Sequence, residues 1–115
     1  TLAALNLLSE INGRKIAVLG DMLELGIYEQ QGHEKVGVRA AEVADTLITV
    51  GKLARIIAES AHKAGLPSSK IHVTDGVEQA TDLLRGLLRE GDVALVKGSH
   101  GLRMDRIAAA LEVES

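Results

Sequence analysis

The sequence predicts an α/β fold, an open and mainly parallel β-sheet with helices on both faces. Four short apolar runs are rich in β-branched residues and do not alternate cleanly with polar residues, which is typical of parallel strands buried on both faces. Segments with apolar residues at helical spacing lie between these runs, and this alternation favours βαβ units. At 115 residues the chain is long enough for one domain and too short for two.

The first predicted element is a helix, because Leu2, Leu5 and Leu8 recur at every third position. This stripe begins without a capping residue, so we expect the chain to be a piece of something longer. The four predicted strands follow at residues 16–19, 46–50, 71–74 and 93–96.

Helices are predicted between the strands, over residues 30–44, 53–64 and 77–90. The first places Val36 and Ala40 on one side, and the last has the most regular apolar stripe, which includes Leu84. Asp75 precedes that stripe and is a candidate N-cap. A final helix after the fourth strand is marked by Met104, Ile107, Ala108 and Leu111.

The composition excludes several classes of protein. The 46% apolar and 25% charged residues are ordinary for a globular domain, and no apolar stretch approaches the roughly 18–20 residues that span a bilayer. We see no signal peptide and therefore expect a cytoplasmic protein without a membrane partner. The absence of cysteine removes disulfides and thiolate sites. A net charge of −3 and a single aromatic residue, Tyr28, argue against a nucleic-acid partner.

Ligands of open parallel sheets bind outside the carboxyl ends of the strands, which directs attention to the loops there. The first loop, "GDMLELG" over residues 20–26, does not match G-x-G-x-x-G, and the chain has no G-x-x-x-x-G-K-[ST] phosphate cradle. What remains is Asp21, which can accept hydrogen bonds from an ammonium group, a sugar hydroxyl or a metal-bound water. The structural alternative is that Asp21 caps a following turn.

The last loop, "LVKGSHGLRM", is richer in groups that bind anions. Lys97 leaves the fourth strand, Gly98 and Gly101 allow close backbone approach, and Ser99 offers a hydroxyl. With the amides that follow, these groups predict a site for a carboxylate or phosphate. The alternative is a solvated lysine followed by a glycine-rich turn.

The four histidines are scattered, and none has metal-ligand spacing with a third ligand nearby, so we expect no metal site. His33 and His100 could face the ligand crevice, whereas His62 and His72 are predicted to be structural.

Carboxylates after the first and third strands and a lysine after the last are also similar to a phosphoacceptor receiver. Receivers carry an adjacent acidic pair after strand one, but Asp21 is followed by Met22, and their lysine usually precedes proline rather than a glycine such as Gly98. A receiver-like switch and a free-standing module that binds a small ligand are therefore the alternative functions.

Four segments together closely resemble the carboxy-terminal domain of the Mur ligase family. They are "GRKIAVLGDMLELG" (13–26), "GHEKVG" (32–37), "LITVGKLA" (47–54) and "GDVALVKGSHGLRMDRI" (91–107), and they cover essentially the whole chain in order. The resemblance implies a Rossmann-like domain over residues 1–115, whose first 13 residues form a helix after an interdomain linker. It also implies two further domains, one for a UDP-sugar and a central P-loop ATPase.

The resemblance implies ATP-dependent amide-bond formation in peptidoglycan synthesis, with D-alanyl-D-alanine as the amino substrate. The carboxylate of UDP-N-acetylmuramoyl-tripeptide would be phosphorylated by ATP and then attacked by the dipeptide amine. ATP and Mg²⁺ would be bound mainly by the central domain, so this chain alone would be inactive. We expect the complete protein to be a monomer.

The site residues follow from the same resemblance, because Asp21, His33, Lys97 and Ser99 match motif positions near the interdomain cleft. Lys97 and Ser99, with the amides around Gly98, would hold the carboxylate of the dipeptide. Asp21 would orient its amino group or lie on the nucleotide side, and His33 would complete the pocket or brace the Asp21 loop. No side chain is predicted to act as a general base, since catalysis here would come from positioning.

Overall fold

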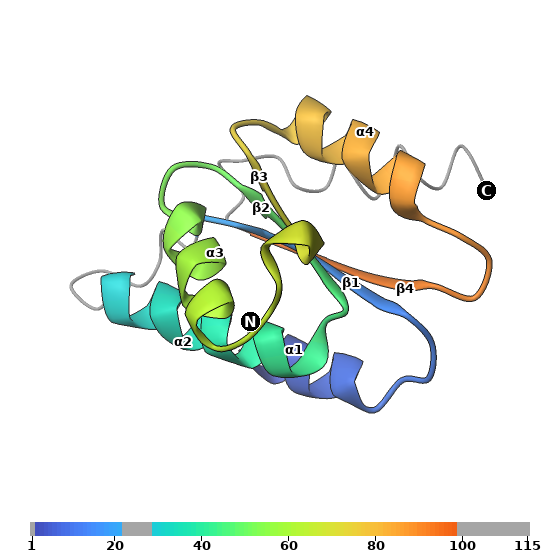
Figure 1. Cartoon of the computed structure of the whole chain (residues 1–115), viewed down its shortest axis with the longest axis horizontal. Coiled ribbons are helices and arrows are strands. Elements are labelled where there is room, and N and C mark those ends of the chain that lie inside the picture. The colour runs from blue at the N-terminus through green and yellow to red at the C-terminus, as the bar shows by residue number, and fades with distance from the viewer. Residues whose placement is uncertain (1, 22–28, 99–115) are drawn as a thin grey trace.

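A computed structural model describes residues 2–21 and 29–98 of the chain. Helices and strands alternate within them as predicted (Figure 1). The elements are α1 Leu2–Ser9, β1 Lys15–Gly20, α2 Glu29–Val43, β2 Thr46–Val50, α3 Ala54–Lys63, the 3₁₀ turn η2 Ser68–Lys70, β3 Ile71–Thr74, α4 Val77–Leu87 and β4 Val93–Lys97. The final helix predicted around Met104–Leu111 and the site residue Ser99 lie outside the described residues.

The four strands form one parallel sheet in the order β3-β2-β1-β4, which confirms the predicted α/β architecture. Gly20 of β1 is in register with Val50 of β2, and Leu19 of β1 is in register with Lys97 of β4. The carboxyl ends of β2, β1 and β4 therefore lie next to one another. The chain order reverses between β1 and β4, and this is where open α/β sheets bind ligands.

Helices cover both faces of the sheet, with α4 on one face and α1, α2 and α3 on the other (Figure 1). Successive residues of β1 point to opposite faces, so Ala17 and Leu19 pack toward α1–α3 while Ile16 and Val18 pack toward α4. These two apolar layers remove the central strands from water, and that burial is the main stabilising term of the fold.

Two details differ from the sequence-based expectation. The strands were expected to be buried on both faces, but only β1 and β2 are, because β3 and β4 form the edges; Val73 of β3 is 47% exposed. The helix predicted over residues 77–90 ends at Leu87, and Leu88 is extended with ψ 133°. The chain turns there because Asp92 accepts from the backbone N–H of Arg89 at 2.9 Å.

Gly37 explains one glycine of the "GHEKVG" motif. A Cβ at this position of α2 would lie 2.5 Å from the backbone oxygen of Ile57 and 2.7 Å from Cβ of Ser60, both in α3. Only glycine leaves room for the two helix backbones at this distance. The residue is thus needed for the packing of α2 on α3, which in turn fixes where α3 begins.

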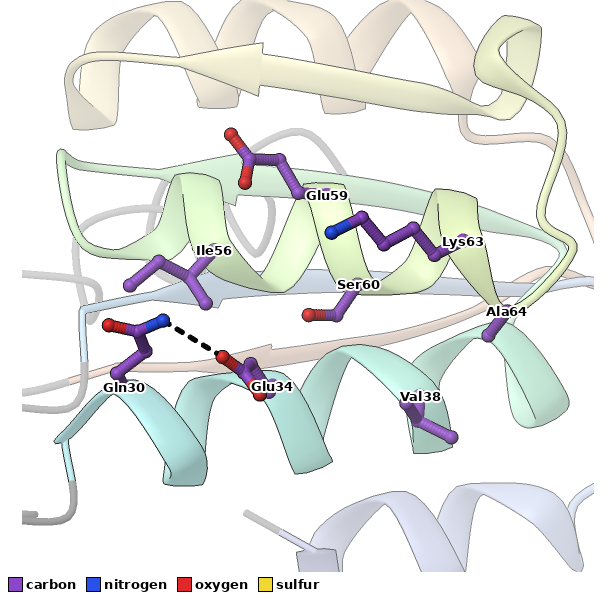
Figure 2. A pocket seen from close by; sticks show the side chains of 8 residues that line it. All are labelled: Gln30, Glu34, Val38, Ile56, Glu59, Ser60, Lys63 and Ala64. Carbon is purple, nitrogen blue, oxygen red and sulfur yellow. Dashed lines mark hydrogen bonds between the residues drawn. The ribbon is translucent and has the colours of Figure 1, made fainter.

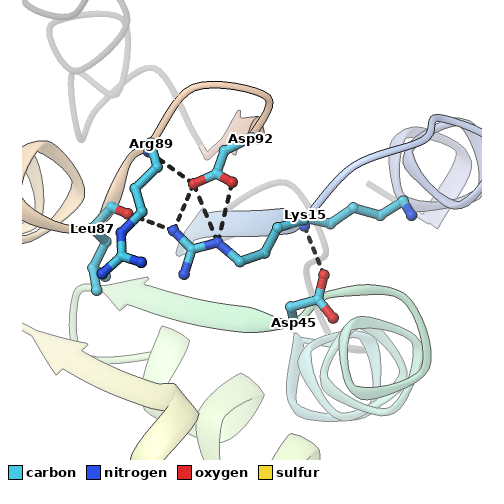
Figure 3. Close-up of polar contacts among 6 residues, drawn as sticks. Lys15, Asp45, Leu87, Arg89 and Asp92 are labelled. Carbon is cyan, nitrogen blue, oxygen red and sulfur yellow. Dashed lines mark hydrogen bonds and ion pairs between the residues drawn. The ribbon is translucent and has the colours of Figure 1, made fainter.

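An ion pair joins the segments that lead into β1 and β4, at the amino ends of the strands and opposite the predicted site (Figure 3). Nη2 of Arg14 lies 2.5 Å from Oδ2 of Asp92 and donates to the carbonyl of Leu87 at the end of α4. The guanidinium of Arg14 holds the pKa of the Asp92 carboxyl below its usual value, and Asp92 raises that of Arg14. A cation at a helix C-terminus is also favourable.

Candidate functional site

Asp21 follows β1 and is almost fully buried, with 9% of its surface exposed. Its Oδ1 accepts a hydrogen bond of 2.7 Å from the backbone N–H of Ala54, the first residue of α3. Leu53, the residue before that helix, supplies no side-chain cap. Asp21 therefore caps α3, the helix that follows the neighbouring strand β2. The turn after Asp21, which the structural alternative has it cap, lies outside the described residues. Satisfying an orphan N–H and facing the positive end of the helix are both stabilising.

Gly51 makes this contact possible. Its φ is +107°, and a Cβ there would lie 2.6 Å from Oδ1 of Asp21. The N–H of Gly51 also donates to the carbonyl of Thr74 at 3.0 Å, which joins the loop after β2 to the end of β3. The loop over residues 51–53 is thus fixed on both sides, by Asp21 and by β3.

Lys97 ends β4 beside Leu19, and Gly98 follows it. The lysine side chain is exposed, and neither it nor Lys52 forms an ion pair with another residue of the described ranges. Lys52 is also exposed, in the loop between β2 and α3. Lys97 thus ends β4 and Lys52 follows β2, the two strands that flank β1, and the buried Asp21 follows β1 between them in the order of the sheet.

His33 lies in α2 and has no exposed surface. A fully buried imidazole does not offer a ring nitrogen to a ligand in the surrounding water. Of its two predicted roles, burial favours bracing the neighbouring structure over completing an open pocket. His62 is exposed on α3, with Nδ1 3.2 Å from the carbonyl oxygen of Leu66.

Asp75 does not have either of the roles considered for it. The residue before α4 is Gly76, no side chain caps this helix, and Oδ1 of Asp75 instead lies 2.7 Å from Nη2 of Arg55. Receivers of the 2-1-3-4-5 type place the third strand next to the first. Here β3 is an edge strand next to β2 only, so Asp75 is separated from Asp21 by a strand. The topology rules out the receiver reading.

A groove of about 410 Å³ runs along the outer surface between α2 and α3 (Figure 2). Its lining is mixed, with apolar Val38 and Ile56 beside polar side chains, and Gln30 donates to Glu34 within it at 3.0 Å. No sequence motif predicts this groove, because it arises from the pairing of two helices. Among residues 2–21 and 29–98, no cluster of His, Asp and Glu is arranged to hold a metal ion. No helix in the same ranges is long and apolar enough to cross a membrane.

Residues 1–100 match the family model described as Mur ligase, glutamate ligase domain. The chain belongs to this family. Among curated relatives, it is 37% identical over 103 residues to the UDP-N-acetylmuramoyl-tripeptide–D-alanyl-D-alanine ligase of Bacillus subtilis, covering 86% of this chain and 22% of that protein. The Escherichia coli ligase of the same name is 34% identical over 114 residues, covering 96% of this chain and 24% of that protein. The chain thus spans about a quarter of the length of these relatives.

Solved structures of this Mur ligase group share the fold. A crystal structure of MurF from Acinetobacter baumannii superposes with a TM-score of 0.78 at 31% identity, covering 95% of this chain and 24% of that one. MurF from Thermotoga maritima, in complex with ADP, gives a TM-score of 0.75 at 28% identity over 96% of this chain and 24% of its own. The family resemblance and the Rossmann-like fold predicted from the four motif segments are therefore confirmed.

Proposed function

We propose that this chain is the carboxy-terminal domain of an ATP-dependent ligase that joins D-alanyl-D-alanine to UDP-N-acetylmuramoyl-tripeptide. The observation that carries the proposal is the match along nearly the whole chain to ligases of that name. The reaction would proceed through an acyl phosphate on the tripeptide, which the amine of the dipeptide attacks. Supplying and positioning that amine is a role that requires no general base from this domain.

ATP and Mg²⁺ would be held mainly by parts of the ligase outside this chain. The relative from Thermotoga maritima was solved with ADP, whereas this sequence contains no G-x-x-x-x-G-K-[ST] loop. The complete protein would act as a monomer in the cytoplasm, where ATP is supplied. The chain alone would have no ligase activity.

The dipeptide carboxylate would be held by Lys97, Ser99 and the amides around Gly98. Lys97 supports this role because its side chain is exposed, unpaired within the described residues, and at the point where the strand order reverses. A carboxylate accepting from an ammonium and from backbone N–H groups forms charge-assisted hydrogen bonds. Asp21 would act by holding the loop after β2, because Oδ1 is already bonded to Ala54.

An amide-shift NMR titration of the chain with D-alanyl-D-alanine, and with L-alanyl-L-alanine as the control, tests the binding role. Shifts near Asp21, Lys97 and Gly98 with the D-isomer alone would support an acceptor pocket in this domain. A flat titration in a well-dispersed spectrum would remove that pocket from the isolated domain. The activity itself is tested by assaying the complete ligase for ATP-dependent joining of the dipeptide; a complete protein that makes no such product refutes the proposal.

A further inference from the structure

Lys52 was not among the residues predicted from the motifs, but the loop that carries it is held by hydrogen bonds on both sides. Gly51 is fixed by a positive φ of 107° and by its bond to Thr74, and the residue two positions after Lys52 is bonded to Asp21. The backbone on both sides of Lys52 is therefore held in one conformation.

The cations near the carboxyl ends of the strands differ in whether a carboxylate is paired with them. Arg55, three residues after Lys52, is paired with Asp75 at 2.7 Å. Lys52 and Lys97 have no carboxylate partner among the described residues. Lys97 ends β4 and Lys52 follows the end of β2, so the two lysines belong to the strands on either side of β1, at the carboxyl ends of the sheet. A flexible ammonium side chain there can reach an anionic ligand bound at the point where the strand order reverses.

The start of α3 would ordinarily be the place for an anion at this edge, since helix N-termini present free N–H groups. Here the N–H of Ala54 is occupied by the carboxylate of Asp21. Asp21 thus fills the position that a ligand phosphate or carboxylate would take. Recognition of an anion here is left to side chains. Arg55 directly follows Ala54 but is paired with Asp75, so the nearest cation in sequence without a carboxylate partner among the described residues is Lys52.

From these contacts we infer that Lys52 binds an anionic group of a substrate, with Asp21 as the positioning residue that holds its loop. The inference rests on the proposed ligase function, which supplies two candidate groups of the same chemistry. One is the carboxylate of the dipeptide, and the other is a phosphate of the nucleotide. Both are oxyanions that an ammonium recognises by a charge-assisted hydrogen bond.

Steady-state kinetics of the complete ligase test this inference, with Lys52→Met as the variant. Lys70→Met is the matched control, because Lys70 is also exposed but lies in η2, directly before β3 and therefore at the amino ends of the parallel strands. Lys52→Met should raise one Michaelis constant about tenfold or more, as expected for a hydrogen bond to a charged group, while Lys70→Met leaves both unchanged. A rise in the constant for the dipeptide identifies the carboxylate, and a rise for ATP identifies the phosphate. If Lys52→Met raises neither Michaelis constant by about tenfold, the inference is overturned.

The role of Asp21 is tested in the same assay. Asp21→Ala should raise the same Michaelis constant as Lys52→Met, and Asp21→Asn, which keeps an acceptor oxygen, should restore most of it. If Asp21 acts through Lys52, adding Asp21→Ala to Lys52→Met should change that constant little further. If the double variant instead raises the Michaelis constant by the product of the two single effects, Asp21 does not act through Lys52. Product formation by the unaltered ligase in the same experiment tests the proposed function separately, so the two failures are distinguishable.

Discussion

The carboxylate of Asp21 accepts a hydrogen bond from the backbone N–H of Ala54 at 2.7 Å, so the end of the first strand caps a helix that starts 33 residues later. This contact joins β1 to the loop after β2 and to α3. Asp21 is a cap of α3, and in our proposal it acts on function through the loop that it holds.

Replacing Asp21 with alanine should lower the free energy of unfolding by about 1–2 kcal/mol, because the N–H of Ala54 loses its partner. Asp21→Asn keeps an acceptor in the same place and should lower it less. Urea unfolding of the 115-residue chain measures both values. Equal stability of the alanine variant and the unaltered chain would mean that the cap contributes nothing.

Gly51→Ala should lower the free energy of unfolding for two reasons, backbone strain at a positive φ and a clash with Asp21. Gly65→Ala serves as the control, because it carries the strain without the clash. Gly51 has φ +107° and a Cβ there would lie 2.6 Å from Oδ1 of Asp21, whereas Gly65 has φ +116° with nothing within 4 Å of a Cβ. Both alanine variants carry backbone strain of about 1–2 kcal/mol. Only Gly51→Ala also displaces Asp21, so urea unfolding should give it the larger loss. The explanation is refuted if Gly65→Ala destabilises as much.

Much of the fold could be predicted from the sequence because its signals are local. The β-branched runs and helical stripes located every described strand and helix, with ends displaced by a few residues. The end of α4 was predicted three residues too late, since Leu88 remains apolar and packs against the core although its backbone is extended. An apolar stripe indicates which residues are buried, and here the apolar contacts continue to Leu88, beyond the last residue of the helix.

The site was less predictable, because its contacts join residues distant in sequence. Asp75 precedes α4 at a typical capping position, but it pairs with Arg55 on a neighbouring element instead. Nothing in the local pattern around Asp21 indicates that its partner is Ala54. The positive φ of Gly51 is likewise set by the fold.

Gly37→Ala and Gly86→Ala should change stability in opposite directions. Both glycines lie in helices, where alanine is ordinarily favoured over glycine by up to about 1 kcal/mol, but Gly37→Ala should be destabilising. A Cβ at Gly37 would lie 2.5 Å from the carbonyl oxygen of Ile57, which cannot move without separating α2 from α3. A Cβ at Gly86 meets nothing within 4 Å, so Gly86→Ala should be stabilising. The midpoint temperature of thermal unfolding, Tm, should fall for Gly37→Ala and rise for Gly86→Ala. A change of Tm in the same direction for both variants would contradict the packing argument.

The stability of the chain should fall in acid partly through Asp92. Its hydrogen bond from Arg14 lowers its pKa below the usual 3.8, so the contribution is complete above that value and is lost as the pH falls through the lowered pKa. Asp92→Asn should therefore be less stable than the unaltered chain at pH 7, and the difference should narrow below about pH 4. Urea unfolding between pH 2 and pH 7 measures this, at approximately constant salt. A difference that stays constant with pH would contradict the linkage.

Two threonines of the central sheet should respond oppositely to replacement by valine, which has nearly the same shape. Oγ1 of Thr49 is buried without a hydrogen-bond partner among the described residues, whereas Oγ1 of Thr74 donates to the carbonyl of Thr49 at 2.6 Å. Burying an unpaired hydroxyl is unfavourable, so Thr49→Val should leave stability unchanged or raise it by about 1 kcal/mol. Thr74→Val removes a made hydrogen bond and should lower stability by about 1 kcal/mol. Urea unfolding measures both, and a loss in Thr49→Val equal to that in Thr74→Val would mean that the Thr49 hydroxyl has a partner, such as a bound water, which stabilises the native sheet.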